Sequence, residues 1–318
     1  MDELLDLARL RAAAERIDPR FLRTPVATDA ALDDALGCEA LLKIETANPI
    51  GSFKGRGADW FVATALRAGE AVVCASAGNF GQGLAHACAR RGHACTVFVG
   101  HGANPLKVEA LLRFGAEVRV AGEDFDAAKQ AARAYAQEQS LRFVEDGLEP
   151  AISEGAGTIG LELADEHVFD AIALPLGNGA LLAGVGSVLR RLRPNVEIVA
   201  VVAQHAPAMK HSLEAGRAIQ TERADTIADG IAVRVPIAST LSLLRRCCDR
   251  VVAVSEAQLF EAMRRLHRHL GQIAEPAGAA GLAAVLADAA HYAGRRVATV
   301  VCGANVAAAL HRRLLQDD

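Results

Sequence analysis

The sequence of 318 residues predicts an α/β protein built from two parallel β-sheets, each covered by helices on both faces. Apolar runs of strand length recur along the chain, and helical stretches with one apolar face follow almost every one of them. Hydrophobic residues make up 52% of the chain but aromatic residues only 4%, so we expect an aliphatic core. A chain of this length fits one large domain or two of ordinary size.

The first half of the chain holds a compact group of alternating strands and helices. Its strand-like runs are "AVVCAS", "ACTVFVG", "AEVRVAG" and "LRFVED". We expect residues 66–147 to form a smaller αβα domain, inserted into a larger one made of residues 1–65 and 148–318. The polar, glycine-rich stretch "EDGLEPAISEGAGTIG" separates the smaller domain from the second set of strands. The cleft between the two domains is the expected site.

The second set of strands has the same pattern. "FDAIALPLG" leads into the helical "LLAGVGSVLRRLRP", "VEIVAVVAQ" follows, and "RVATVVCG" lies near the end of the chain. Strands that are apolar throughout, each followed by an amphipathic helix, are typical of a parallel sheet with both faces covered.

Composition excludes several classes of function. The net charge is −4, which gives no reason to expect a nucleic-acid or membrane partner, and no run of about 18 uncharged apolar residues is present. The N-terminal residues form a charged amphipathic pattern rather than a secretion signal. Seven cysteines without C-x-x-C spacing favour a reduced, cytoplasmic protein over disulfides or a zinc site.

One lysine, Lys54, stands among small residues in "GSFKGRGA". In a mostly apolar cleft a lysine loses hydration, which favours its neutral, nucleophilic form. The neighbouring glycines would let a cofactor approach the backbone closely. From this stretch alone, a loop lysine that reaches into solvent is an equally good interpretation.

Two further loops lie where a strand gives way to a helix, the position at which ligands gather in open α/β sheets. "SAGNFGQG" begins at Ser76, and its helix N-terminus suits an anion such as a carboxylate, although a structural turn has the same composition. "PLGNGALLAG" would offer backbone donors to a phosphate. A dinucleotide site is disfavoured, because the spacing from Gly177 to Gly184 is G-x-G-x-x-x-x-G and Glu197 opens the next strand instead of ending it.

A cysteine, Cys302, ends the last apolar strand. A lone buried cysteine is usually inert packing. At the C-terminal end of a strand it could instead present its thiol to the ring of a ligand.

Taken in order, six stretches of this chain resemble the fold type II pyridoxal-phosphate enzymes, in particular the serine/threonine dehydratases and serine racemases. They are "SFKGRGA", "SAGN", the glycine-rich loop, "TIADGIAV", "EPAGAAGLAA" and "CGAN". The resemblance spans nearly the whole chain, and matches in this order are far more specific than any one of them. It implies a fold like that of the tryptophan synthase β subunit, pyridoxal 5′-phosphate as cofactor, an amino acid as substrate and a homodimer.

The resemblance also implies roles for the matching positions. Lys54 would form an imine with the cofactor aldehyde and return as a base, while Phe53 would pack beside the cofactor. Asn79 would bond the 3-hydroxyl of the ring, and Cys302 would face the pyridine nitrogen. Glu275 matches a glutamate near the site. The remaining matches are Ser76, Ala77 and Gly78, which with Asn79 would bind the substrate carboxylate, and Gly177, Asn178, Gly179, Ala180 and Leu181, which would form the phosphate cup.

The activity implied is that of an ammonia-lyase, which removes water and then ammonia from L-threonine- or L-serine-type β-hydroxy amino acids to give a 2-oxo acid. A thiol has a reference pKa of about 8.5, so Cys302 would be mostly neutral and would favour prompt β-elimination over transamination. A related elimination or replacement on threo-hydroxyaspartate, a hydroxyectoine-derived amino acid or cysteine is the alternative. A catalytically idle protein that binds pyridoxal phosphate is a third hypothesis, against which Lys54, Asn79 and Cys302 together argue.

Several positions depart from the pattern of that family. Ala77 stands where the racemases carry a second serine, so we expect weak racemisation or none. Phe80 replaces a histidine of many threonine dehydratases, and the cup reads GNGAL where four glycines are common. Gln204 replaces a cation-binding glutamate and Lys210 lies near the place of an aspartate, so we expect no metal there; either the Lys210 ammonium fills the position or both are surface residues. The chain ends after the catalytic domain, and no isoleucine-binding regulatory domain is expected.

Overall fold

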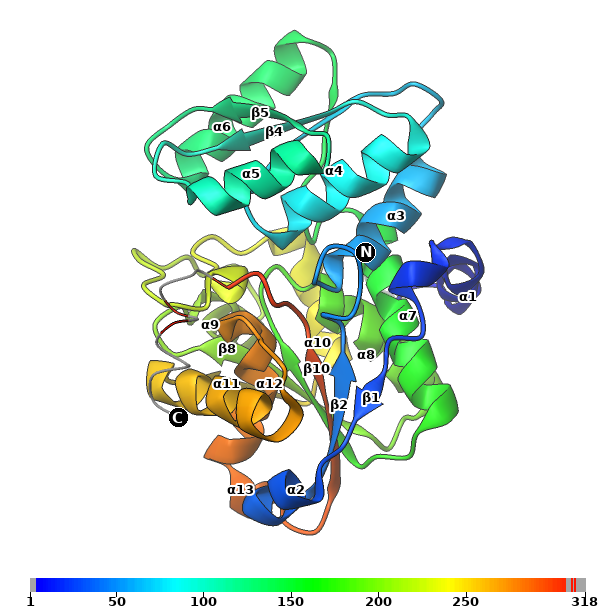
Figure 1. The fold of residues 1–318 in the computed structure, drawn as a ribbon, viewed down its shortest axis with the longest axis vertical. Helices are drawn as coiled ribbons and strands as arrows, with labels where there is room; N and C mark the ends of the chain where they lie inside the picture. The colour runs from blue at the N-terminus through cyan, green and yellow to red at the C-terminus, as the bar shows by residue number, and fades with distance from the viewer. Residues whose placement is uncertain (1–3, 307–309, 311, 313–318) are drawn as a thin grey trace.

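Two separate β-sheets organise the chain, as the sequence predicts (Figure 1). The structure is a computed structural model that describes residues 4–306, 310 and 312. Within these residues one sheet has six strands in the order β1-β2-β10-β7-β8-β9, and the other has four in the order β5-β4-β3-β6. The four-stranded sheet lies in the upper part of Figure 1, and the six-stranded sheet lies below it.

The larger sheet is parallel except at one edge. Its strands are β1 (Val26–Ala27), β2 (Glu39–Ile44), β7 (Ala171–Pro175), β8 (Glu197–Ala203), β9 (Arg250–Val254) and β10 (Arg296–Val301). Only β1 runs antiparallel to its neighbour, β2. A strand of two residues is too short to give a periodic pattern, which is why the sequence did not predict it.

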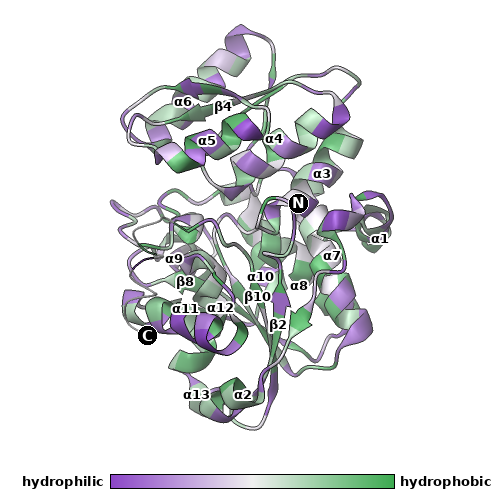
Figure 2. Ribbon diagram, in the orientation of Figure 1, coloured by the Kyte–Doolittle hydropathy of each residue, from purple (hydrophilic) through white to green (hydrophobic). Residues whose placement is uncertain are grey.

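Helices cover both faces of this sheet because the strand side chains alternate between two apolar clusters. On one face, Ile172 and Leu174 of β7 join a cluster with residues of α7 (Pro150–Glu166), α8 (Ala180–Leu192) and α10 (Leu241–Cys247). On the other, Ala171 and Ala173 join a cluster with residues of α2 (Ala30–Leu36), α11 (Glu256–Leu270) and α12 (Pro276–Ala287). The buried residues of α11 recur at helical spacing, and Figure 2 shows the mixed hydropathy of this helix.

The smaller sheet repeats this arrangement within residues 72–143. Its parallel strands are β3 (Val72–Ala75), β4 (Cys95–Val99), β5 (Glu117–Val120) and β6 (Arg142–Phe143). One face packs on α6 (Phe125–Glu138), where Val73 meets Ala132 and Ala136. The other packs on α4 (Asn79–Arg91) and α5 (Pro105–Arg113). The two-domain αβα architecture is therefore as predicted, and the bounds given for the two domains stay a prediction.

The other described elements connect or flank these layers. They are α1 (Leu7–Arg16), η1 (Pro19–Phe21), α3 (Lys54–Ala65), α9 (Ala208–Ala215), η2 (Asp229–Ile231), η3 (Ala238–Thr240) and α13 (Ala289–Tyr292). Of these, α3 joins the two halves of the molecule, since its Trp60 and Phe61 belong to the same apolar cluster as residues of the smaller sheet.

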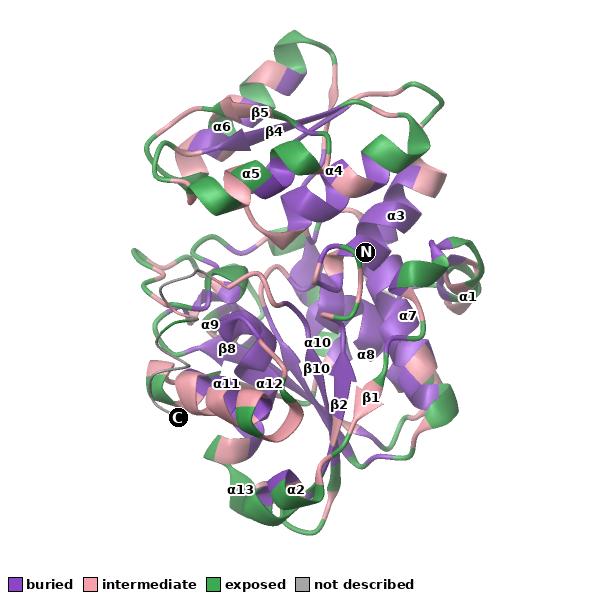
Figure 3. Ribbon diagram, viewed as in Figure 1, coloured by how far each residue is buried: buried purple, intermediate pink, exposed green. Residues whose placement is uncertain are grey.

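The stretch expected to separate the two domains is mostly a long buried helix. Residues 150–166 form α7, and Figure 3 shows most of it buried, together with the adjoining part of α8. Its glycines are places of close packing: a Cβ on Gly155 would lie 2.6 Å from the backbone oxygen of Arg56, and one on Gly160 would lie 3.1 Å from the Cα of Val185. Glycine and polar residues that suggested a separator therefore serve helix–helix contact.

All seven cysteines are free thiols, and six of them are buried. Among the described residues, no helix combines the length and the apolar character that a membrane span requires.

Candidate active site

A cavity of about 730 Å³ lies where the C-terminal ends of strands from both sheets meet. Residues that follow β3, β6, β7 and β10 all line it, as the rule for parallel α/β sheets leads one to expect. Every residue to which the sequence gave a place in the site is among its lining residues: Phe53, Lys54, Ser76, Ala77, Gly78, Asn79, Gly177, Asn178, Gly179, Ala180, Leu181 and Cys302. The cavity size is in the range of small-molecule sites.

Lys54 is the first residue of α3 and points into this cavity. Its Nζ lies 2.6 Å from Oδ2 of Asp146 and 4.6 Å from the centre of the Phe53 ring. The Lys54 side chain is 15% exposed and that of Asp146 is 20% exposed. The interpretation as a solvated loop lysine is therefore wrong.

The glycines next to Lys54 serve packing. A Cβ on Gly55 would lie 2.1 Å from the Phe21 ring, and one on Gly57 would lie 2.4 Å from the backbone oxygen of Ile152. These contacts correct the expectation that the glycines make room for a cofactor at the backbone. The two glycines let α3 pack closely against η1 and α7. This packing sets the position of Lys54, the first residue of α3.

A buried ion-pair network also holds the start of α3. Arg56, fully buried, donates to both oxygens of Glu45 at 2.8 and 2.7 Å and to Glu162 on α7. Lys43 Nζ lies 2.6 Å from the same Glu162. Burial opposes the charge of Arg56, but the carboxylates of Glu45 and Glu162 raise its pKa. Because every charge in the network has a partner, the first turn of α3 is held rigidly.

Asp146 was not predicted as a site residue. It follows β6, and its neighbour Glu145 is paired with Lys129 and Arg133. Asp146 pairs with Lys54 through Oδ2, while its Oδ1 is buried and has no hydrogen-bond partner. The signal that could have found it is its position, since "LRFVED" ends a parallel strand at the edge where ligands gather.

Asn79 is fixed by contacts to both atoms of its amide. Nδ2 donates to Oε1 of Glu275 at 2.7 Å, and Oδ1 accepts from Nδ2 of Asn305 at 2.6 Å. Burial raises the pKa of Glu275 to about 7, the charge of Asp229 adds to this, and the bond from Asn79 opposes it. The structure thus places Glu275 in the cavity, where the resemblance expected a glutamate.

The loop before α4 presents small groups to the cavity. Ser76, Ala77 and Gly78 lie between β3 and α4, and the Gly78 amide donates to Oγ of Ser76 at 3.2 Å. No side chain caps α4, whose first residue is Asn79. An uncapped helix N-terminus favours an anion. Phe80 is buried beside this loop and lines the cavity.

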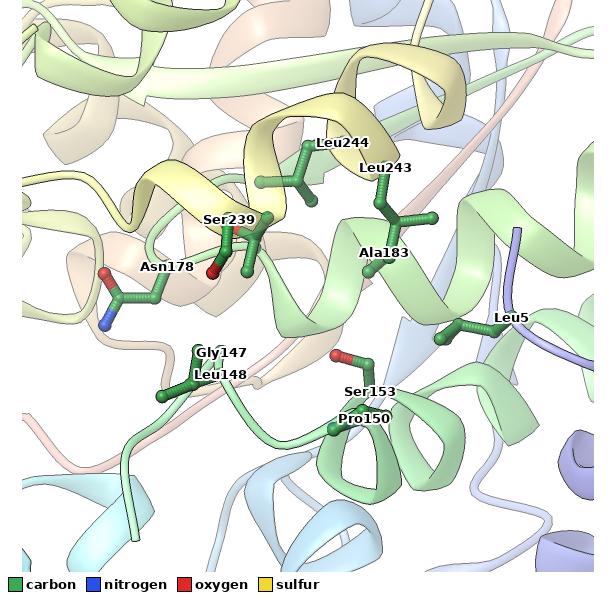
Figure 4. A pocket seen from close by; sticks show the side chains of 12 residues that line it. Leu5, Gly147, Leu148, Pro150, Ser153, Asn178, Ala183, Ser239, Leu243 and Leu244 are labelled. Carbon is green, nitrogen blue, oxygen red and sulfur yellow. The ribbon is translucent and has the colours of Figure 1, made fainter. Parts of the chain in front are cut away.

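The glycine-rich loop before α8 has the same character. Gly179 has a φ of 99°, and a Cβ there would lie 2.6 Å from Leu244. No side chain caps α8, so its N-terminus is a second place suited to an anion. Asn178 and Gly179 also line a second cavity of about 20 Å³, shown in Figure 4, between α7, α8 and α10. This second cavity is large enough only for about one water molecule.

Cys302 directly follows β10 and is buried. Its Sγ lies 3.7 Å from the backbone oxygen of Ala277. Burial, and then the charge of Glu275, raise the pKa of the Cys302 thiol. The thiol is therefore neutral at physiological pH, as expected from its reference value.

The cavity is more charged than the sequence indicated. A mostly apolar cleft was expected, but acidic residues line it in excess over basic ones. The acidic residues are Asp124, Asp126, Glu145, Asp146, Glu222, Asp225, Asp229 and Glu275, and the basic ones are Lys54, Lys107, Lys129, Arg223 and Arg234. Most come from loops and helix starts that carry no motif, which is why periodicity did not reveal them.

Gln204 and Lys210, which replace the cation-binding residues of related enzymes, lie outside the cavity lining. Gln204 is exposed, and the ammonium of Lys210 donates to Glu214 one helical turn further on. Lys210 is thus a surface residue of α9 rather than a replacement for a metal ion. Among the described residues, no group of three or more His, Cys, Asp or Glu is arranged to hold a metal.

Comparison with known proteins gives consistent results. The L-threonine ammonia-lyase of Thermotoga maritima is 34% identical over 306 residues, covering 95% of this chain and 76% of that protein. A crystal structure of threonine deaminase from T.th. matches with a TM-score of 0.89 and 34% identity, over 95% of this chain and 99% of that one. Maize serine racemase matches with a TM-score of 0.91 and 26% identity, over 99% and 98%.

The family model described as "Pyridoxal-phosphate dependent enzyme" matches residues 17–303. The residues of the cavity fit that cofactor. Lys54 offers an amine to an aldehyde, and the uncapped N-terminus of α8 offers backbone donors to a phosphate. The loop before α8 is tightly packed, since a Cβ on Gly177 would lie 2.8 Å from the backbone oxygen of Gly230. The chain belongs to the pyridoxal-phosphate-dependent enzymes of fold type II, in the serine/threonine dehydratase-like group.

Proposed function

We propose that this enzyme is an ammonia-lyase for β-hydroxy amino acids of the L-threonine and L-serine type. It removes water from the substrate, and hydrolysis of the resulting imine then returns one water, releases ammonia and leaves a 2-oxo acid. The observation that carries the proposal is the Lys54 amine, which lies in a cavity between two uncapped helix N-termini, those of α4 and α8. The names of the threonine-directed relatives support the choice of substrate.

Pyridoxal phosphate, when bound, supplies an aldehyde that joins the amino group and a conjugated ring that withdraws electrons from the α-carbon. The residues of this chain do the rest. Residues 177–181 bind the phosphate through backbone amides, and residues 76–79 bind the substrate carboxylate. Lys54 is the base that takes the α-proton onto Nζ. The Phe53 ring lies beside this Nζ, with its centre 4.6 Å away.

Cys302 and Asn79 tune the reaction. A neutral thiol at Cys302 would give no counter-ion to a protonated ring nitrogen of the bound cofactor, which would favour rapid loss of the β-hydroxyl over transamination. Asn79, held by Glu275 and Asn305, offers a fixed amide to the cofactor ring. Pre-set donors of this kind need no rearrangement during the reaction.

The charges around the cavity disfavour one of the alternative substrates, threo-hydroxyaspartate. Because acidic residues exceed basic ones, a neutral or cationic β-substituent is favoured over the second carboxylate of threo-hydroxyaspartate. Cysteine and a hydroxyectoine-derived amino acid remain the second candidates. A homodimer, a cytoplasmic location and the absence of a nucleic-acid partner stay predictions, which sedimentation and cell fractionation can check.

The test is a 2-oxo acid assay on the purified protein with pyridoxal phosphate. L-threonine, L-serine, L-cysteine and threo-3-hydroxyaspartate are offered separately, and the products are identified by mass spectrometry. We expect 2-oxobutanoate from threonine or pyruvate from serine, and no D-amino acid by chiral chromatography, since Ala77 has no proton to give. A protein that binds the cofactor normally but yields no 2-oxo acid from any of these would refute the proposal.

Variants of two lysines separate catalysis from idle cofactor binding. Lys54→Ala removes the amine, so both the absorbance of the attached cofactor and turnover should be lost. Lys129→Ala, which changes a lysine paired with Glu145 in the same cavity, is the control and should keep both. Cofactor attachment that survives Lys54→Ala would favour a carrier without activity.

A further inference from the structure

The pair formed by Lys54 and Asp146 is the strongest unassigned feature of the cavity. Nζ of Lys54 and Oδ2 of Asp146 lie 2.6 Å apart, within hydrogen-bond distance, and both side chains are largely shielded from solvent. The other oxygen of the same carboxylate, Oδ1, is buried with no hydrogen-bond partner. A buried carboxylate oxygen without a partner costs free energy, so its retention calls for a reason.

The acidic residues near Asp146 pair with basic residues other than Lys54. The neighbouring acid, Glu145, already has Lys129 and Arg133, and across the cavity Asp229 has Lys107. The Asp146 charge is therefore matched by the Lys54 ammonium and by no other basic group among the ion pairs of the described residues.

The backbone also holds Asp146 in place. The next residue, Gly147, has a φ of 87°, and a Cβ there would lie 2.6 Å from the backbone oxygen of Asn178. The Asp146 loop therefore packs directly on the glycine-rich loop before α8. A carboxylate fixed in this way can return a released lysine to the same position in every cycle.

We propose that Asp146 is the positioning residue of Lys54, holding its ammonium whenever Lys54 is not bound to the cofactor. The inference rests on the proposed function. When the Lys54 amine takes the α-proton, the Cα–H bond breaks and its electron pair stays with the substrate, while the new N–H bond leaves a positive charge on Nζ. The fixed negative charge of Asp146 stabilises that ammonium and keeps Nζ directed into the cavity. Asp146 thus positions Nζ and is not itself the base.

The first test needs no turnover. The cofactor-free full chain is labelled briefly with acetic anhydride at pH 7, and acetylation of each lysine is measured by mass spectrometry. In Asp146→Asn the loss of the counter-ion favours the uncharged amine, so Lys54 should react about tenfold faster. Lys129 and Lys210 are internal references whose rates should not change. An unchanged Lys54 rate would overturn the proposal.

The second test uses the cofactor-loaded enzyme. We expect Asp146→Asn to lower kcat about 100-fold with little change in KM, because Lys54 loses its fixed position. The lower-pH limb of the kcat profile should move to lower pH, and Asp146→Glu should restore part of the rate. Glu39→Gln is the control, an exposed acid outside the cavity lining that pairs with Arg296 at 2.6 Å, and should match the wild type.

The outcomes distinguish this inference from the proposed function. A raised KM with unchanged kcat would make Asp146 a substrate-binding group and would overturn the inference. Faster Lys54 acetylation in a protein that makes no 2-oxo acid would support the pair and refute the ammonia-lyase. Loss of fold in Asp146→Asn would show in circular dichroism, and Asp146→Ser, which also removes the charge, then takes its place in both tests.

Discussion

At the scale of single residues, Glu275 couples the site to pH. It is buried at the start of α12, where it accepts a hydrogen bond from Asn79 and is influenced by the charges of Asp229 and Lys107. Its pKa of about 7 lies above the ordinary value of 4.5, mainly because of burial. Between these two pH values the folded protein therefore keeps a proton on Glu275 that the unfolded chain has released. The stability linked to Glu275 is therefore full below about pH 4.5 and is lost as the pH rises through about 7.

Glu275→Gln should remove this dependence, because glutamine keeps an oxygen that accepts from Asn79 but has no proton to lose. Between pH 5 and pH 8 the free energy of unfolding of the wild type should fall by about 2 to 3 kcal/mol relative to Glu275→Gln. Urea unfolding of the cofactor-free protein at both pH values measures it. Glu39→Gln, an exposed acid paired with Arg296, is the control and should follow the wild type. Parallel wild-type and Glu275→Gln curves would contradict the prediction.

The residue scale also shows where the sequence was informative. Lys54, Asn79 and Cys302 stood in motifs with fixed neighbours, and the structure brings all three to one cavity. Asp146 belongs to no motif, because its place in the site depends on its contact with Lys54, 92 positions earlier in the chain. A pair of this kind arises from how α3 and the β6 loop pack, which no local pattern reveals.

At the scale of elements, the contact between α7 and α8 sets the position of the glycine-rich loop. A Cβ on Gly184 of α8 would lie 2.2 Å from the backbone oxygen of Ser153 and 2.5 Å from the amide of Gly157. These are backbone atoms inside α7, so they cannot rotate away as a side chain could. The N-terminus of α8, which is the expected phosphate site, is therefore positioned by glycine against helix backbone.

Gly184→Ala should force the two helices apart. We expect a loss of stability of about 1 to 3 kcal/mol from overpacking, together with weaker cofactor binding as the α8 N-terminus moves. Urea unfolding and titration of the cofactor-free protein with pyridoxal phosphate measure the two effects. The control is Gly102→Ala, which would meet nothing within 4 Å and should stay within about 0.5 kcal/mol of the wild type. Normal cofactor affinity in a destabilised Gly184→Ala would show that this contact does not set the site.

The elements mark the limit of periodicity as a guide. The runs "ACTVFVG" and "LLAGVGSVLRRLRP" form β4 and α8 as predicted, because apolar runs and amphipathic spacing are local properties. Strands β2 and β9 and helix α11 were not predicted, although α11 has the same amphipathic spacing. The glycines and polar residues of α7 gave the opposite impression. Thr158 and Glu154 are buried there because Arg56 and Trp60 bond them, so polarity in this helix reflects internal partners.

At the scale of the whole molecule, two ion pairs span the cavity between the helices of the smaller sheet and the loops of the larger one. Lys107 of α5 pairs with Asp229 of η2, and Asp126 of α6 pairs with Arg234. All four residues line the cavity. Sequence patterns within either half could not predict these pairs, because each depends on how the two sheets lie relative to one another.

Arg234→Met should loosen this closure with little effect on the fold. An exposed pair contributes about 0.2 to 1 kcal/mol, so unfolding should change by less than about 1 kcal/mol. If the pair helps to hold the cavity closed over substrate, KM at low salt should rise by about two- to fivefold, with kcat unchanged. Added salt should raise KM of the wild type toward that of the variant, because mobile ions screen the exposed pair. Arg119→Met, which breaks an exposed pair with Glu117 inside β5, is the control. Equal KM values for Arg234→Met and Arg119→Met across the salt series would mean that these charges join the two halves without governing access to the site.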